Sequence, residues 1–327
     1  MEYSCKHLDY IDVTKGLLIY LVVVGHIVSG DPLVNKYIFW FHMPAFLIIS
    51  GMFVKPTENI KDALKKKVFR LFIPYFFFSM LLGSIARGNL LKQLLGTIWG
   101  GNANTTCYTF PYYYIVTLFG SFCLFYLFSF WMNKTKVRYQ GLFYIGVYVL
   151  MHLLAYYFPE RVLGWIPWNI DMSLNVMLYL YIGKLIMVYG KKTKHIVLIS
   201  LVLIAIFVEL DNIGIIHYVF DLKHHRWMLG LDVIIPCVCL FPLIALSKGL
   251  TKIPVVSKII GDWGKGSLVI LLLHPLFREL NGMYLVSFNE FILSLINVVE
   301  CMIMYKVLAS NSYTKILIGE KSKILKY

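Results

Sequence analysis

Long apolar stretches are the feature of this sequence that most restricts its fold. Ten of them approach the roughly 20 apolar residues that an α-helix needs to cross a bilayer. The predicted spans are Tyr10–Val28, Tyr37–Val54, Val68–Ile85, Pro111–Trp131, Gly141–Phe158, Ile170–Tyr189, Ile196–Leu210, Trp227–Leu246, Ser267–Leu280 and Phe288–Leu308. Only 15% of the 327 residues are charged, against about a quarter in soluble domains. We therefore expect an all-α, polytopic membrane bundle of about ten transmembrane helices.

The segments between these stretches are too short to act as domain linkers. We expect a single transmembrane domain over residues 1–327, with the first stretch retained, because no small-residue cleavage site follows it. The six cysteines are scattered and show no zinc-binding spacing. We therefore expect no metal site and no resident cofactor.

Positive charge is distributed unevenly between the connecting segments. In a soluble protein, a net charge of +14 would indicate nucleic-acid binding, but the basic and aromatic stripe of a nucleic-acid groove is missing. With a cytoplasmic N-terminus, 24 of the 31 Lys and Arg residues fall on the inner side and 7 on the outer side. Because cytoplasmic loops are enriched in basic residues, we expect both termini to be cytoplasmic and the span count to be ten. We expect no nucleic-acid partner.

The connecting segments differ in character on the two sides of the membrane. The most basic one is Lys55–Arg70, whose Lys61–Val68 stretch predicts an amphipathic helix on the inner surface. This helix would either attract anionic lipids, at about 1 kcal/mol per basic residue, or hold an anionic cofactor. The outer segments Gly88–Phe110, Pro159–Asn169 and Asp211–Arg226 hold the polar and aromatic residues expected around a hydrophilic acceptor.

Three ionisable residues lie in the first predicted span, where such residues are costly and usually functional: Asp12, Lys15 and His26. Lys15 and His26 are 11 positions apart, about 20° beyond three full helical turns, so both lie on one face. Along the axis they are roughly 16 Å apart. Asp12 precedes Lys15 by three positions and can pair with it.

A shared face predicts one channel lined by both residues. The cation of Lys15 at the inner mouth can hold an anionic donor. The imidazole of His26, with an ordinary pKa of about 6.5, suits a general base acting on an acceptor hydroxyl. The alternative is structural: an interhelical hydrogen bond for His26 and a snorkelling side chain for Lys15.

The first span also carries a recognisable motif. The residues Tyr10–Gly16, followed by Val22–His26, resemble the opening of the acyltransferase-3 family of membrane sugar O-acyltransferases. That family has a basic residue, ten positions and then a histidine in its first helix, which Lys15 and His26 match. Many members have arginine where this chain has Lys15.

Further motifs follow in the order that the family has them. They are Phe41–Phe46 with Ile49–Gly51, Lys67–Pro74, Pro111–Tyr114, Pro167–Asp171 with Gly183, and Leu271–Pro275. The element around Asp171 is similar to that of the fucose 4-O-acetylase-like branch. The inner basic pair begins with Lys67 rather than arginine, which reduces bidentate phosphate contact there. The motif at Pro111–Tyr114 lacks its tryptophan.

The resemblance implies transfer of an acyl group, usually acetyl, from cytoplasmic acyl-CoA to a sugar hydroxyl at the cell membrane. His26 would be the general base. Lys15, Lys67 and Arg70 would hold the phosphates of the donor, acetyl-CoA, or orient its thioester. The implied acceptor is an envelope sugar or polysaccharide.

Other polar residues inside or beside the predicted spans can have a functional or a structural role. His42 either belongs to the site or hydrogen-bonds to backbone freed by Pro44. His274 and Asp171 can bind or orient substrate. Asp232 either serves the site or pairs with a neighbouring helix. No GxSxG motif is present, so a Ser/His/Asp nucleophile is not supported.

A second function from a different class is an exporter or flippase for an envelope polysaccharide or lipid-linked sugar. That function predicts substrate movement that is independent of acyl-CoA and of His26. No internal repeat is apparent, which counts against a transporter.

Overall fold

The computed structural model describes residues 8–28, 31–54, 59–132, 134–158, 166–190, 194–218, 220–221, 228–285 and 288–320. Its helices are α1 (Asp9–Ile27), α2 (Pro32–Phe39), α3 (His42–Met52), α4 (Ile60–Lys67), α5 (Ile73–Arg87), α6 (Leu90–Trp99), α7 (Tyr113–Trp131), α8 (Val137–Tyr157), α10 (Ile170–Tyr189), α11 (Lys194–Asn212), α12 (Leu231–Leu250), α13 (Pro254–Lys265), α14 (Ser267–Tyr284), α15 (Glu290–Ser310) and α16 (Thr314–Leu317). These residues contain no strand, which confirms the all-α fold class. Parts of two outer segments, 159–165 and 222–227, and several of the loop lysines lie outside the described residues.

Every predicted span coincides with helix, but one of the ten differs from the others. Within the described chain, nine helical segments are long and apolar enough to cross a membrane. The predicted span Ser267–Leu280 forms α14 and is not among the nine. The reason is its second half, which carries the polar side chains His274, Arg278 and Glu279.

The second predicted span is broken into two helices. The segment Tyr37–Val54 was expected to be one helix, but α2 ends at Phe39 and α3 begins at His42. Pro44 cannot donate a backbone hydrogen bond and would clash with the carbonyl four residues earlier in a continuous helix. The turn therefore falls at Trp40, whose carbonyl instead accepts from the hydroxyl of Tyr218 at 3.4 Å.

The amphipathic helix expected over Lys61–Val68 is present as α4, and its position on the inner surface stays a prediction. It is not separate from the third span. A π-helical turn at Val68–Phe72 joins α4 to α5 without interruption. Pro74 follows this turn, and the wider turn accommodates the ring where a regular helix would clash with the carbonyl of Arg70. Arg70 therefore lies at the base of a long helix rather than in a loop.

The segment Gly88–Phe110, which was expected to hold polar and aromatic residues around a hydrophilic acceptor on the outer side, is partly helical. It folds back along α5 as α6, whose buried face is polar and whose outward face is apolar. The exposed apolar side chains are Leu90, Leu91, Leu95, Ile98 and Trp99. On the buried face, Gln93 Nε2 donates to Asn104 Oδ1 at 2.6 Å, and Tyr75 donates to the carbonyl of Thr97 at 3.0 Å. A helix with this inverted pattern suits lipid rather than water.

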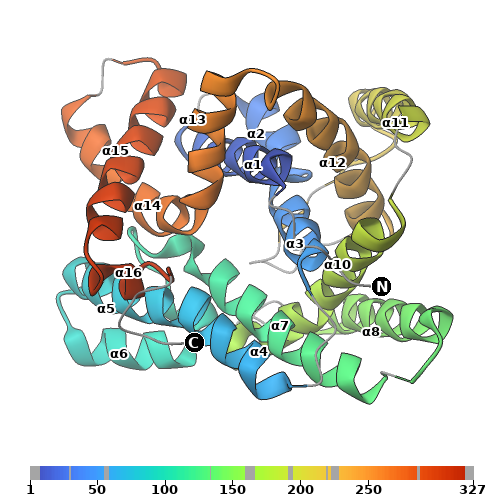
Figure 1. Ribbon diagram of the computed structural model, residues 1–327, viewed down its shortest axis with the longest axis horizontal. Coiled ribbons are helices and arrows are strands. Elements are labelled where there is room, and N and C mark those ends of the chain that lie inside the picture. Colours follow the sequence, from blue (N-terminus) through green and yellow to red (C-terminus); the bar gives the residue numbers. More distant parts are fainter. Residues whose placement is uncertain are drawn as a thin grey trace.

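Helix α13 falls in a segment that was expected to be an inner loop. It packs along α1, and both lie in the upper part of the bundle in Figure 1. The contact depends on glycine: a Cβ at Gly264 would overlap the carbonyl oxygen of Asp12, and one at Gly16 would overlap that of Ile260. Small residues at crossings allow such close approach in membranes. Because α1 also packs against α3, α12, α14 and α15, it is enclosed on several sides.

Candidate active site

Three histidines from three helices lie together at one end of α1. The rings of His26 on α1 and His274 on α14 are 5.4 Å apart between centroids and nearly parallel, at 15°. His42 on α3 is linked to them by Phe39, whose ring centroid is 5.9 Å from that of His26 and 5.0 Å from that of His42. Sequence reasoning selected all three histidines singly, and the structure brings them together.

Two of these histidines hydrogen-bond to the backbone carbonyl four residues earlier in the chain. His42 Nδ1 lies 2.7 Å from the carbonyl oxygen of Ile38, and His274 Nδ1 lies 3.0 Å from that of Ile270. The expectation that His42 would use the carbonyl freed by Pro44 is therefore wrong in detail, because that carbonyl belongs to Trp40. His42 is buried, and so is His274, whereas His26 keeps part of its surface accessible.

An aromatic ring and a cation complete this end of the site. The ring centroid of Phe110 is 4.9 Å from that of His26 and 5.9 Å from that of His274. The guanidinium of Arg278 lies over the Phe110 ring, with Cζ 4.8 Å from its centroid. Sequence reasoning missed Phe110, Phe39 and Arg278. For Arg278 a signal was available, because it follows His274 by four positions and so shares its helical face.

The predicted donor-binding cations gather near the other end of α1. Lys15 Nζ lies 3.4 Å from Asp12 Oδ1, which confirms the predicted pairing. Lys67 Nζ lies 3.3 Å from the ring centroid of Phe122, and Lys15 and Arg70 are near enough for their charges to interact with it. Three cations and one carboxylate leave an excess of positive charge at this place, which suits an anionic ligand.

The two clusters are held apart by a continuous helix. Helix α1 runs without a break from Asp9 to Ile27, so the 11 positions between Lys15 and His26 correspond to roughly 16 Å along its axis. The unbroken helix is the condition on which the distance expected from the sequence depended. A molecule that contacts both clusters must be elongated.

The predicted carboxylates lie in different places. Asp171 is buried in the first turn of α10, after Trp168 and Asn169, which both have positive φ. Asp171 takes no part in the ring contacts that join His26 to His274, Phe39 and Phe110. The orienting role expected of Asp171 therefore stays a prediction.

Asp232 joins a separate buried cluster between α8 and α12. One carboxylate oxygen accepts a hydrogen bond from Tyr148, and the other lies 2.9 Å from His152 Nε2. Its backbone carbonyl accepts from Tyr179 at 3.0 Å. The interpretation of Asp232 as a helix-pairing residue is confirmed. In the described part of the chain, no group of three or more His, Cys, Asp or Glu side chains is arranged to hold a metal ion.

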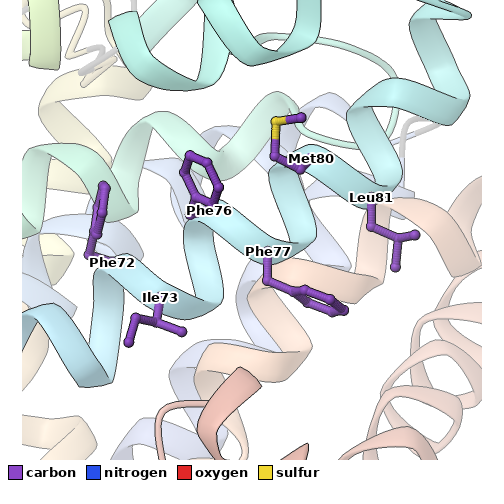
Figure 2. A pocket seen from close by; sticks show the side chains of 6 residues that line it. All are labelled: Phe72, Ile73, Phe76, Phe77, Met80 and Leu81. Carbon is purple, nitrogen blue, oxygen red and sulfur yellow. The ribbon is translucent and has the colours of Figure 1, made fainter. Parts of the chain in front are cut away.

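An apolar groove of about 450 Å³ lies along α5 and the turn before it. Figure 2 shows its six lining side chains, which are Phe72, Ile73, Phe76, Phe77, Met80 and Leu81. Phe72 also stacks on Trp168, with 5.5 Å between ring centroids. The lining side chains carry no acid, base or hydrogen-bond donor, so the groove cannot perform the chemistry of the histidine end.

Comparison with known families identifies the family of the chain. The sequence model of the acyltransferase-3 family, described as an acyltransferase domain, matches residues 8–304. The match includes both the histidine and the cation clusters. The chain belongs to this family and is a membrane acyltransferase. No curated protein and no solved structure matches the chain.

Proposed function

We propose that this member of the acyltransferase-3 family moves an acyl group, in particular acetyl, from cytoplasmic acyl-CoA to a hydroxyl of an envelope sugar or polysaccharide. The observation that carries the proposal is the pairing of two clusters on one helix. Near one end of α1, Lys67 and Arg70 lie close to Lys15, and near the other end His42 and His274 lie close to His26. We place the protein in the bacterial cell membrane with both termini cytoplasmic.

The donor would bind by its phosphates. Lys15, Lys67 and Arg70 provide ammonium and guanidinium donors for them, and the ring of Phe122 holds Lys67 in place. Phosphate recognition by such groups uses charge-assisted hydrogen bonds. The elongated pantetheine arm of coenzyme A then extends along α1 and brings the thioester toward His26. Coenzyme A is a substrate in this scheme, and the protein supplies no cofactor of its own.

The chemical step would occur at His26. A ring nitrogen of His26 takes the proton of the acceptor hydroxyl while the hydroxyl oxygen attacks the thioester carbonyl carbon. The tetrahedral intermediate collapses, the carbon–sulfur bond breaks, and the thiolate takes the proton from the imidazolium. The products are the sugar ester and free coenzyme A. His42, His274 and Asp171 would orient the acceptor, and Asp12 would orient Lys15.

The test is the variant His26→Ala in purified protein reconstituted into vesicles with radiolabelled acetyl-CoA. General-base catalysis contributes about 10²–10⁴-fold, so we expect transfer to fall by that factor with unchanged folding. His195→Ala is the matched control, because His195 is exposed on the peripheral helix α11. Mass spectrometry of envelope glycans with and without the protein would identify the lost acetyl increment. Full transfer by His26→Ala would refute the proposal, and an exporter would keep its function in that variant.

A further inference from the structure

The hydrogen bonds of His274 fix the position of its ring proton. A backbone carbonyl can only accept, so the 3.0 Å contact with Ile270 requires that His274 Nδ1 carries the proton. In the neutral ring, Nε2 is then a lone-pair acceptor. The contact between His42 Nδ1 and the carbonyl of Ile38 imposes the same tautomer on His42.

Among the residues that the structure describes, none provides a hydrogen-bond partner for the acceptor nitrogen of His274. Nε2 is buried, and the side chain has 0% of its surface exposed. A buried polar atom without a hydrogen bond costs about 1–3 kcal/mol. Its ring is nearly parallel to that of His26, with 5.4 Å between the two ring centroids. A ligand that satisfies this atom must bring a hydrogen-bond donor.

We infer that His274 is a positioning residue whose Nε2 accepts a hydrogen bond from a second hydroxyl of the acceptor, next to the hydroxyl that His26 deprotonates. This inference rests on the proposed function and narrows it. The acceptor is a neutral polyol with neighbouring hydroxyls. A carboxylate or phosphate at this position would bring no proton and would face the lone pair of Nε2.

His274 is distinguished from the base by its surroundings. Its ring is enclosed and tied to Ile270, whereas His26 is partly accessible and makes ring contacts but no described hydrogen bond to protein. A group that exchanges protons with a substrate needs access to it, whereas a group that fixes the orientation of the substrate gains from rigidity. His26 therefore deprotonates one hydroxyl of the diol, and His274 binds the other.

The first test compares trans-cyclohexane-1,2-diol with cyclohexanol as acceptors in the vesicle assay. We expect the wild-type KM for the diol to be about tenfold lower, the effect of one hydrogen bond. His274→Gln can place an amide oxygen near the position of Nε2 and should keep this preference. His274→Asn can keep the bond to Ile270 but loses the acceptor at Nε2, and should abolish the preference by raising the KM for the diol.

Three outcomes would overturn the inference. The first is equal KM values of the wild-type protein for the diol and for cyclohexanol. The second is a diol preference that survives in His274→Asn, which is expected if Nε2 accepts a hydrogen bond from a water molecule instead of from the acceptor. A loss of kcat in His274→Gln as large as in His26→Ala would make His274 a base instead. Wild-type protein that acylates neither alcohol nor any envelope glycan would contradict the proposed function itself.

A second readout does not depend on turnover. In ¹⁵N-histidine-labelled protein in bilayers, NMR distinguishes protonated from unprotonated ring nitrogens. We expect His274, assigned by its loss in His274→Gln, to show an unprotonated Nε2 whose signal shifts when the diol is added. A protonated Nε2, or a signal unaffected by saturating diol, would overturn the inference.

Discussion

Replacing Lys67 by methionine removes one cation from the proposed donor site with little change in shape. Lys67 Nζ lies 3.3 Å from the centroid of Phe122, and a methionine side chain can keep contact with that ring. A hydrogen bond to a charged group contributes about 1.5–3 kcal/mol. Since about 1.4 kcal/mol is a factor of ten, the KM for acetyl-CoA should rise about ten- to a hundredfold. Because the phosphates do not react, kcat should stay close to the wild-type value.

The assay is initial-rate transfer from radiolabelled acetyl-CoA in vesicles, at low and at high salt. Lys66→Met is the matched control, because Lys66 is the exposed neighbour of Lys67 on α4. We expect Lys66→Met to leave KM within about twofold, as for an exposed charge. Salt should raise the wild-type KM more than that of Lys67→Met, because the variant has already lost one of the screened interactions.

Two results would refute this reasoning. If Lys67→Met has the wild-type KM, the cation does not contact the donor. If Lys66→Met and Lys67→Met raise KM equally, the lysines act by general attraction of anions to the surface, and the contact between Lys67 and Phe122 has no special role.

Two further predictions concern stability. Gly264→Ala places a Cβ against the carbonyl of Asp12 and should lower the free energy of unfolding by about 1–3 kcal/mol, measured by thermal unfolding in detergent. Gly282→Ala is the control, because a Cβ there meets open space and should not lower the free energy of unfolding. Equal melting temperatures for the two alanine variants would contradict the close contact of α1 and α13. Asp232→Ala removes the carboxylate that pairs with His152 and should lower the free energy of unfolding by about 1–3 kcal/mol for each group left unsatisfied. An unchanged melting temperature would contradict the role of Asp232 in pairing the helices.

The sequence alone determined the membrane bundle, because hydrophobicity and helical period are local properties. Each predicted span became helix, and the pair Lys15 and His26 kept its separation, since both lie on one unbroken helix. The pairing of Asp12 with Lys15 was equally accessible, because residues three apart are neighbours on any helix. The family motifs added the acyltransferase assignment, which the match over residues 8–304 supports.

Only the tertiary structure decided which faces meet. The burial of the polar face of α6 and the close crossing of α13 on α1 depend on contacts between separate elements of the chain. The same holds for the site: Phe110 and His274 reach His26 from segments more than 80 positions away. Hydropathy measures the transfer of each segment into lipid and is nearly the same for every rotation of a helix about its axis. Packing at glycines and backbone hydrogen bonds select one rotation, and that selection brings the three histidines together.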